Sequence, residues 1–292
     1  MIWFKPSILS PSYADARLGW GLAAAAGLAA AILLLIVLLL LRESWPVLQR
    51  VGGVRFFADQ GWYPAEEMYG LAPMLWATLA ASFGAVLLAG PLGVASALFC
   101  RHYAPFSVAR LYRRMVTLLA GIPSVVFGFW GLTVLVPLLA QFQPPGASLL
   151  TGILILALMI LPTVALTADA ALAAVPDAYL RGAAALGLSR GATIAGVVLP
   201  AARGGIISGV LLATARALGE TMAVLMVAGN VVQTPTSLFD PVRTLTANIA
   251  LEMAYASGDH RAALFVSGLM LMGLVIILAA AAWRLSGGRL HG

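Results

Sequence analysis

The chain has 292 residues, of which 62% are hydrophobic and only 10% are charged, and its formal net charge is +6. Soluble domains carry about 25% charged residues, so this composition, together with a mean hydropathy of +0.99, predicts an integral membrane protein. The basic residues are scattered in short segments between apolar runs. That pattern excludes a nucleic-acid-binding patch and indicates that these charges set the orientation in the membrane.

Long apolar segments occur along the whole chain. A transmembrane helix needs about 20 mostly apolar residues. Six segments meet this requirement, at residues 19–41, 71–99, 115–140, 149–168, 204–231 and 262–283. The first is too long for the core of a secretory signal, and RESWP follows it rather than a cleavage site of small residues. The sequence therefore predicts an all-α membrane protein with six spans.

The basic residues predict the orientation of these spans. Six spans place both termini on one side, and if that side is the cytoplasm, eleven of the 17 Lys and Arg residues lie in cytoplasmic segments. Five then lie in outer segments, and Arg216 lies within a span. Because cytoplasmic loops carry the excess of basic residues, we expect both termini in the cytoplasm.

Prolines interrupt or bound the second, third and fourth spans. Pro123, in the sequence GIPS, predicts either a hinge in the wall of a pathway or an ordinary helix kink, because proline frees a backbone carbonyl. In the outer segment 232–261, Leu245, Ile249 and Met253 share one face of a helix. We interpret this segment as a short helix that lies on the outer surface or dips into it.

The longest cytoplasmic loop, about residues 169–203, carries its own helix signals. Pro176 and Asp177 predict a helix start with Asp177 as the N-cap. Gly187 suits the left-handed residue that ends a helix, and Ser189 is placed to cap a second segment. We expect a short helix at the cytoplasmic face, which either rests on lipid headgroups or docks into a groove on a partner protein.

The fifth span has a stripe of small residues and, beside it, two charges. Gly205, Gly209, Ala213 and Ala217 recur every four residues, a pattern that lets membrane helices pack closely. We interpret this stripe as a helix-packing surface rather than a ligand site.

Arg216 and Glu220 lie on the neighbouring stripe of the same span. Charges at bilayer depth are costly and are usually functional. One interpretation is an internal ion pair between residues four apart, which reduces the cost of burial. The other is an anion pathway, because the guanidinium fork matches phosphate oxygens and stays charged. Thr221 and Asn230 would then add neutral hydrogen bonds.

The cytoplasmic loop resembles the EAA loop of ABC-importer permeases. The family pattern is Glu-Ala-Ala, three residues, Gly, nine residues, Ile, one residue and Leu-Pro. The residues that we align with this pattern are Gly182, Ala183, Ala184, Gly187, Val197, Leu199 and Pro200. In this alignment Gly182 replaces the usual Glu, and Val197 replaces Ile. The stretches LLAGIPSVVFGFWGL (118–132) and RALGETMAVLMVAGN (216–230) are similar, within this family, to the C-type permease subunit of phosphate-specific ABC transporters.

The resemblance implies a type I ABC-importer permease fold in the bacterial inner membrane. It divides the chain into an N-terminal part, residues 1–70, and a permease core, residues 71–285. It implies transport of inorganic phosphate together with an A-type sister permease, two copies of a cytoplasmic ATPase subunit and an extracytoplasmic phosphate-binding protein. The EAA-loop helix, including Asp177, would couple the chain to the ATPase, which uses the ATP. The permease itself would bind no cofactor.

The sequence has no signature of an enzyme. No G-x-x-x-x-G-K-[ST] motif occurs, there is no nucleophile elbow, and the three histidines are far apart and lack metal-ligand spacing. Three alternatives stay open: a permease for another oxyanion such as molybdate or sulfate, a transporter or channel that does not use ATP, and a purely structural membrane subunit. Internal repeats, which are frequent in secondary transporters, are not evident.

Overall fold

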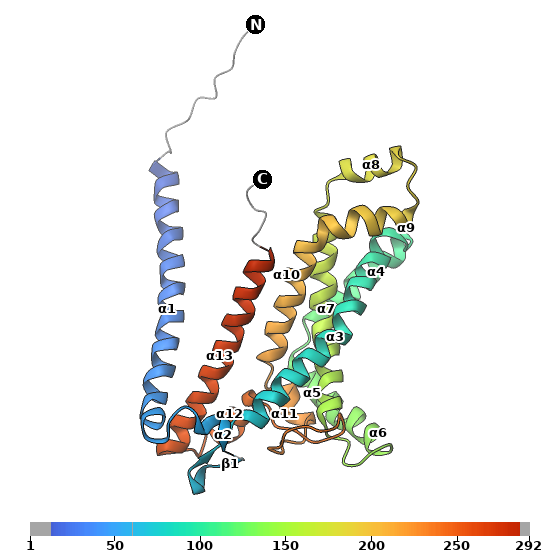
Figure 1. Ribbon diagram of the computed structural model, residues 1–292. Helices are drawn as coiled ribbons and strands as arrows, with labels where there is room; N and C mark the ends of the chain where they lie inside the picture. Colours follow the sequence, from blue (N-terminus) through green and yellow to red (C-terminus); the bar gives the residue numbers. More distant parts are fainter. Residues whose placement is uncertain (1–12, 60, 287–292) are drawn as a thin grey trace.

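Long apolar helices make up most of the protein, in a computed structural model that describes residues 13–59 and 61–286 (Figure 1). Within these residues, five helical runs are long and apolar enough to cross a membrane. They are α1 (Tyr13–Val51), α3 (Ala72–His102), α7 (Leu149–Ala173), the run of α9 (Arg190–Thr193), η3 (Ile194–Val198) and α10 (Leu199–Leu218), and α13 (Gly258–Ser286). The multi-span helical architecture predicted from the sequence is confirmed.

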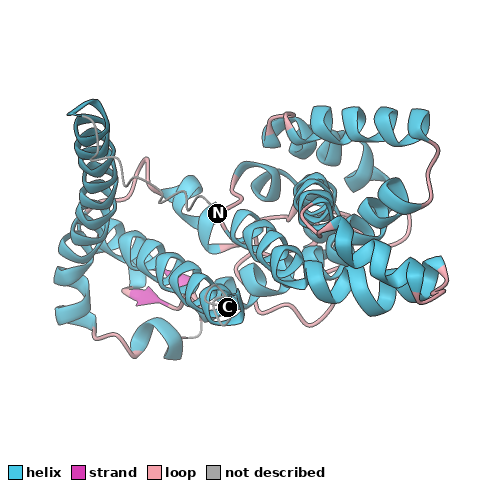
Figure 2. Cartoon of the chain, turned by 90° about the horizontal axis from the view of Figure 1, so that it is seen from above, coloured by secondary structure: helices cyan, strands magenta, loops and turns pink. Residues whose placement is uncertain are grey.

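Short elements join these helices, as a view from above shows (Figure 2). They are α2 (Arg55–Ala58), η1 (Pro64–Glu66), α8 (Asp177–Ala185), α11 (Met222–Val227) and α12 (Leu245–Glu252). Strands β1 (Trp62–Tyr63) and β2 (Met68–Tyr69) form an antiparallel pair in which Trp62 lies opposite Tyr69. The short outer helix expected within 232–261 is thus present as α12, and it is largely buried.

The third predicted span, 115–140, is not one helix. Helix α4 (Phe106–Ala120) is followed by α5 (Ser124–Trp130), η2 (Gly131–Leu135) and α6 (Val136–Ala140), and the two parts meet at 93°. Gly121 ends α4, and Pro123 precedes the first residue of α5. The break is far sharper than an ordinary proline kink, because the helix ends completely before the proline and starts again after it.

The fifth predicted span, 204–231, also differs from the structure. The helical run begins earlier, at Arg190, and ends at Leu218, where Gly219 donates its N–H to the carbonyls of Ala215 and Ala217. Residues 222–227 form the separate helix α11. Apolar composition alone did not reveal this end, since the sequence stays apolar on both sides of the break.

Two π-helical turns each come just before a proline. The N–H of Val136 is bonded to the carbonyl of Gly131, five residues back, and the N–H of Leu199 to that of Ile194. Pro137 and then Pro200 follow directly. A proline ring collides with the carbonyl four residues before it in a regular α-helix. The wider turn moves this carbonyl aside, so that α6 and α10 continue through their prolines.

The core lies between α3 and α7 and extends to α10 and α11. On α3, Ala77, Ala81, Ala85 and Ala89 recur every four residues and are at most 2% exposed. A Cβ added at Gly93 would lie 2.8 Å from Cβ of Val164 on α7. Small side chains therefore let the two helices approach closely, which is how helices associate in a solvent as apolar as their own side chains.

Helix α1 stands at the edge of the bundle, where it packs along α13 (Figure 1). Its large apolar side chains, such as Leu33 at 65% and Leu38 at 53%, are exposed in the single chain. In the membrane these side chains face lipid or another subunit.

Candidate functional site

Helix α8 lies beyond the end of the bundle, between α7 and α9 (Figure 1). The predicted start of this helix is correct to one residue, but Asp177 is not its N-cap. The N-cap is Pro176, no side chain caps the helix, and Asp177 is its first helical residue. A carboxylate in the first turn still interacts favourably with the helix dipole.

The end of α8 is a Schellman motif, as the glycine in the sequence predicted. Gly187 adopts φ of +68°, in the left-handed region. Its N–H is bonded to the carbonyl of Ala184 at 3.0 Å, and the N–H of Leu188 to that of Ala183 at 3.1 Å. Ser189 then accepts a hydrogen bond from the N–H of Ala192 at 3.3 Å, so the predicted second cap is confirmed.

The surface of α8 is suited to a protein partner. Ala183 is 4% exposed and faces the rest of the chain, whereas Leu186 is 80% and Tyr179 is 54% exposed. Large apolar side chains projecting from a helix outside the bundle are typical of a contact with another subunit. Gly182 and Ala184 are exposed on the same helix.

The remaining residues aligned with the EAA pattern lie outside α8. Val197 belongs to η3, and Leu199 and Pro200 begin α10. A strict count of three residues between the triplet and Gly187 moves the triplet one residue toward the N-terminus. Arg181, rather than Gly182, then takes the place of the family's Glu, so that position carries the opposite charge.

The helix break after α10 separates the two charges of the fifth span. Arg216 is in the last turn of α10, where a cation interacts favourably with the helix dipole. Glu220 lies in the break, and its Oε1 accepts a hydrogen bond from the N–H of Ala223 at 3.2 Å, at the start of α11. The internal ion pair considered from the sequence is not formed. Arg216 is exposed in the single chain and forms no hydrogen bond or ion pair with the described residues.

Thr221 and Asn230 occupy different surroundings. The Thr221 hydroxyl is bonded to the carbonyl of Gly219 at 3.3 Å, within the break. Asn230 lies beyond α11 with φ of 55°, and its Nδ2 donates to the carbonyl of Leu225 at 2.7 Å. The structure therefore places Thr221 beside Glu220, whereas it uses the Asn230 side chain to end α11.

The small residues of the fifth span face α7. A Cβ at Gly205 would lie 2.6 Å from Cβ of Ala171, and one at Gly209 would lie 2.6 Å from Cβ of Thr167. Ala213 and Ala217 continue this stripe and are 0% and 3% exposed. Arg216 points away from this packed stripe, since it is exposed.

The two broken spans lie side by side. A Cβ added at Gly128 of α5 would lie 2.8 Å from Cα of Ala223 in α11. One added at Gly131 would lie 2.9 Å from Cγ1 of Val227. Non-helical backbone at membrane depth is tolerated only where protein buries it or where it lines a water-filled cavity. The close contacts of α5 and η2 with α11 show that protein buries this part of the two broken spans.

A polar cluster at the opposite end from α8 was not predicted from the sequence. Glu252 is 7% exposed, and its carboxylate accepts hydrogen bonds from Arg243 Nη1 at 2.7 Å and Trp62 Nε1 at 2.7 Å. His260 Nε2 lies 2.8 Å from the same carboxylate. Arg243 also donates to the carbonyl of Asn230 at 3.0 Å. Glu252, an acidic residue within the predicted outer helix, was the only local sign of this cluster in the sequence, because its partners come from other segments.

This cluster is connected to the break in the fifth span. The Thr246 hydroxyl, in the first turn of α12, donates to the backbone carbonyl of Glu220 at 2.8 Å. In the same turn, the N–H of Leu245 is bonded to the hydroxyl of Thr78 on α3 at 3.0 Å. Helix α12 therefore holds the break in place from the outer side.

Comparison with known proteins found a family whose members resemble this chain. Residues 89–289 match the family described as binding-protein-dependent transport system inner membrane component. The probable ABC transporter permease protein YqgH of Bacillus subtilis is 40% identical over 211 residues, which are 71% of this chain and 68% of that protein. The phosphate transport system permease protein PstC of Mesorhizobium japonicum is 37% identical over 256 residues, covering 80% of this chain and 77% of the relative. PstC of Haemophilus influenzae is 33% identical over 249 residues, or 78% and 79% of the two chains.

Solved structures share the fold at lower identity. A chain of the MetNI methionine ABC transporter in an inward-facing conformation superposes with a TM-score of 0.61 at 18% identity, covering 76% of this chain and 96% of that one. A chain of a bacterial ABC transporter involved in alginate import gives a TM-score of 0.58 at 16% identity, with 94% and 100% coverage. These likenesses show that the arrangement of helices is that of type I ABC-importer permeases.

Proposed function

Because the chain belongs to the family of binding-protein-dependent transport system inner membrane components, we propose that it is the permease subunit of an ATP-driven importer of inorganic phosphate. The observation that carries the substrate is its similarity to PstC proteins at 33–37% identity over more than three quarters of each chain. The chain is a multi-pass protein of the inner membrane, and its role is transport rather than catalysis.

A permease of this family works in a complex that includes ATPase subunits. We assign α8 as the element that docks into the ATPase, since it projects from the bundle with Leu186 and Tyr179 exposed. Two ATPase copies would serve this chain and an A-type sister permease. ATP would be bound and used by those copies, with no cofactor held by the permease. A phosphate-binding protein would deliver the substrate to the end that carries α12.

The pathway in this proposal passes Arg216 and the break between α10 and α11. The guanidinium group is within a membrane span and has no partner among the described residues. A charged group at this depth is stable only where it faces water or an anion. Its fork of donors matches the oxygens of phosphate, which must regain contacts as it loses its hydration shell. Glu220 holds the start of α11 beside it.

Uptake of labelled phosphate, sulfate and molybdate by cells with and without this chain tests the proposal. At low external concentration, we expect phosphate uptake alone to disappear without the chain, and to depend on ATP. Loss of sulfate or molybdate uptake with unchanged phosphate uptake would assign the permease to another oxyanion. Phosphate uptake that persists after ATP depletion would contradict an ABC importer altogether.

A further inference from the structure

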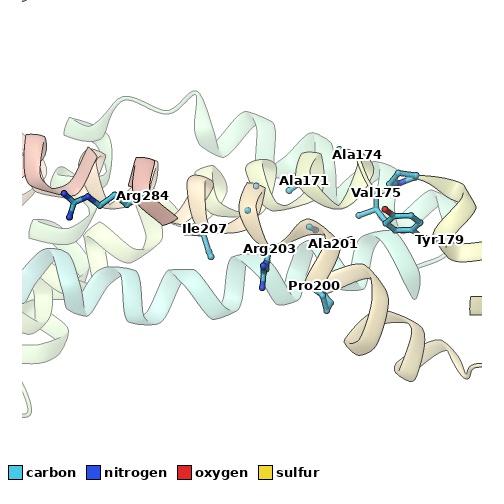
Figure 3. Close-up of a pocket in the computed structure, with 13 residues that line it drawn as sticks. Ala171, Ala174, Val175, Tyr179, Pro200, Ala201, Arg203, Ile207 and Arg284 are labelled. Carbon is cyan, nitrogen blue, oxygen red and sulfur yellow. The ribbon is translucent and has the colours of Figure 1, made fainter. Parts of the chain in front are cut away.

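Two cavities follow one another along α10 and α13, which pack against each other. The larger, of about 740 Å³, lies where α7 ends, α10 begins and α13 ends (Figure 3). The smaller, of about 260 Å³, is lined by residues 208–215 of α10 and 275–279 of α13. On both helices, the residues that line the smaller cavity lie further from α8 than the residues that line the larger cavity. The smaller cavity lies between α10 and α13. In the larger one α13 contributes only Arg284, and the other lining residues come from α10, the end of α7, the turn after it and Tyr179 of α8. The two cavities therefore occupy successive depths along α10.

The larger cavity is basic. Arg203 from α10 and Arg284 from α13 line it, and none of the described residues that line it is acidic. Figure 3 shows the two arginines on different helices, with Ile207 between them in the view. Both side chains are exposed, and neither forms a hydrogen bond or ion pair with the described residues. Two unpaired guanidinium groups at one cavity attract an anion with phosphate oxygens.

The backbone of α10 keeps this cavity open. Gly204 is among the residues that line it, and a Cβ added there would meet no atom within 4 Å. A larger side chain at this position would therefore occupy the cavity without disturbing the packing of α10. Gly205 differs, because its added Cβ would lie 2.6 Å from Ala171.

The smaller cavity is apolar and lies deeper in the membrane. Leu211 and Leu212 line it from α10, and Val275 and Leu278 line it from α13. All four belong to helical runs long and apolar enough to span a bilayer. A groove of this kind accommodates methylene groups and offers nothing to a free anion.

We propose that the two cavities along α10 bind an anionic phospholipid of the cytoplasmic leaflet, with the headgroup phosphate at Arg203 and Arg284 in the larger cavity and an acyl chain along Leu211 and Val275 in the smaller one. The positive-inside rule assigns the arginine-bearing end to the cytoplasm. Basic pockets between membrane helices on that side are suited to acidic headgroups. The order of the two cavities matches the order of headgroup and acyl chain in a lipid.

The charge and the apolar groove together favour a lipid over other occupants. Free phosphate would use the arginines but leave the apolar cavity empty. An acidic segment of a neighbouring subunit would be attracted by the same charges, yet it would have to place apolar side chains in a groove at bilayer depth. One phospholipid molecule would place its headgroup in the basic cavity and an acyl chain in the apolar one, and the membrane supplies phospholipid in excess.

Native mass spectrometry of the assembled transporter, purified with equal amounts of phosphatidylglycerol and phosphatidylethanolamine, tests this site. The double variant Arg203→Gln/Arg284→Gln should lower phosphatidylglycerol binding about fivefold for each arginine removed, while phosphatidylethanolamine binding stays the same. Arg114→Gln is the matched control, because Arg114 is exposed on α4 and does not line either cavity. It should change neither lipid.

Gly204→Leu separates loss of charge from loss of space. This variant should lower binding of both lipids, since it fills the cavity and keeps the arginines. It also tests the site if the double variant fails to assemble. Unchanged phosphatidylglycerol binding in both variants would overturn the proposal. So would displacement of the lipid by excess inorganic phosphate, which would show a free-anion site. A groove that holds lipid in the isolated chain but not in the assembled transporter would show that a neighbouring subunit covers it, and would also overturn the proposal.

Discussion

Arg243 and Glu252 form an ion pair, with 2.7 Å between Nη1 and Oε1, in which the two side chains are only 20% and 10% exposed. The same carboxylate accepts a hydrogen bond from Trp62 of β1 and lies beside His260 of α13. One side chain of α12 thus links the loop after α11, the strand pair and the last span. A single buried carboxylate is therefore the polar contact that these three segments of the outer end share.

Replacing Glu252 by Ala should destabilise the protein by about 3–5 kcal/mol, because Arg243 is left as a largely buried charge without its partner. Trp62 also loses its acceptor. The measurement is the thermal unfolding midpoint of the purified protein in detergent. Glu66→Ala is the control, since Glu66 is exposed, and its effect should stay within about 0.5 kcal/mol. Equal midpoints for the two variants would show that the cluster contributes little.

Gly209→Ala should destabilise the bundle by about 1–3 kcal/mol, because the new Cβ would collide with Thr167 on α7 and force the helices apart. Gly273→Ala, in α13, is the matched control, since its Cβ meets nothing within 4 Å. That change should leave stability equal or slightly higher, as alanine is the better helix former. The thermal unfolding midpoints of the two variants, measured under the same conditions, test this explanation. A control as harmful as Gly209→Ala would remove the packing explanation.

Leu186→Glu should abolish association with the ATPase while leaving the permease folded. Leu186 is 80% exposed, so the substitution removes no contact within the chain. Retention of the ATPase subunits during affinity purification of the permease measures the effect. Leu238→Glu, at the outer end with 51% exposure, is the control and should retain the ATPase in full. Normal retention by the Leu186 variant would assign α8 to the lipid headgroups instead.

Arg216→Ala should stop phosphate uptake and leave assembly of the complex intact, because the guanidinium has no partner within the described chain to lose. Arg216→Lys keeps the charge but not the planar fork, so it should restore only part of the activity. Uptake and complex recovery are measured on the same cells. Loss of assembly in Arg216→Ala would point to a structural role at the interface with the sister permease.

The loop before α12 should open in acid. The backbone N–H groups of Thr236 and Ser237 and the Thr236 hydroxyl, all bonded to Asp240 Oδ2, lower the pKa of this carboxyl. Since the folded-state pKa is below the unfolded value, the stabilisation is complete above the ordinary aspartate pKa and is lost as pH falls through the lowered one. Amide exchange at Thr236 and Ser237, corrected for intrinsic rates, should therefore rise only in strong acid.

Asp240→Asn provides the comparison for this pH effect. Its amide cannot ionise, so exchange at Thr236 and Ser237 should be faster at neutral pH and show no acid step of its own. An acid step of the same size in this variant would assign the titration to another group.

Much of the fold follows from the sequence, because long apolar runs and cap residues act locally. The spans, the left-handed Gly187 and the Ser189 cap are examples of such local signals. A hinge at Pro123 was one of two interpretations of the sequence, whereas the break at Gly219 was missed. Which outcome occurs depends on whether neighbouring helices satisfy the freed backbone groups rather than on composition.

The candidate site was only partly predictable. The spacing of Arg216 and Glu220 suggests an ion pair on an ideal helix, and the end of α10 between them removes that geometry. Trp62 and Glu252 are 190 residues apart in sequence. No local pattern indicates that a tryptophan in one outer loop donates to a carboxylate in another, so this contact required the three-dimensional arrangement.

The π-turn η3 sets how the faces of α9 are oriented relative to those of α10. A regular α-helix turns about 100° per residue, and the extra residue within Ile194–Val198 offsets the faces of α9 from those of α10 by about that angle. Removing one residue from this turn would therefore rotate α9 around the axis of α10. A chain with that deletion would keep every span, yet it would displace one of the two ends at which α8 is attached, and with it the surface that we propose for the ATPase.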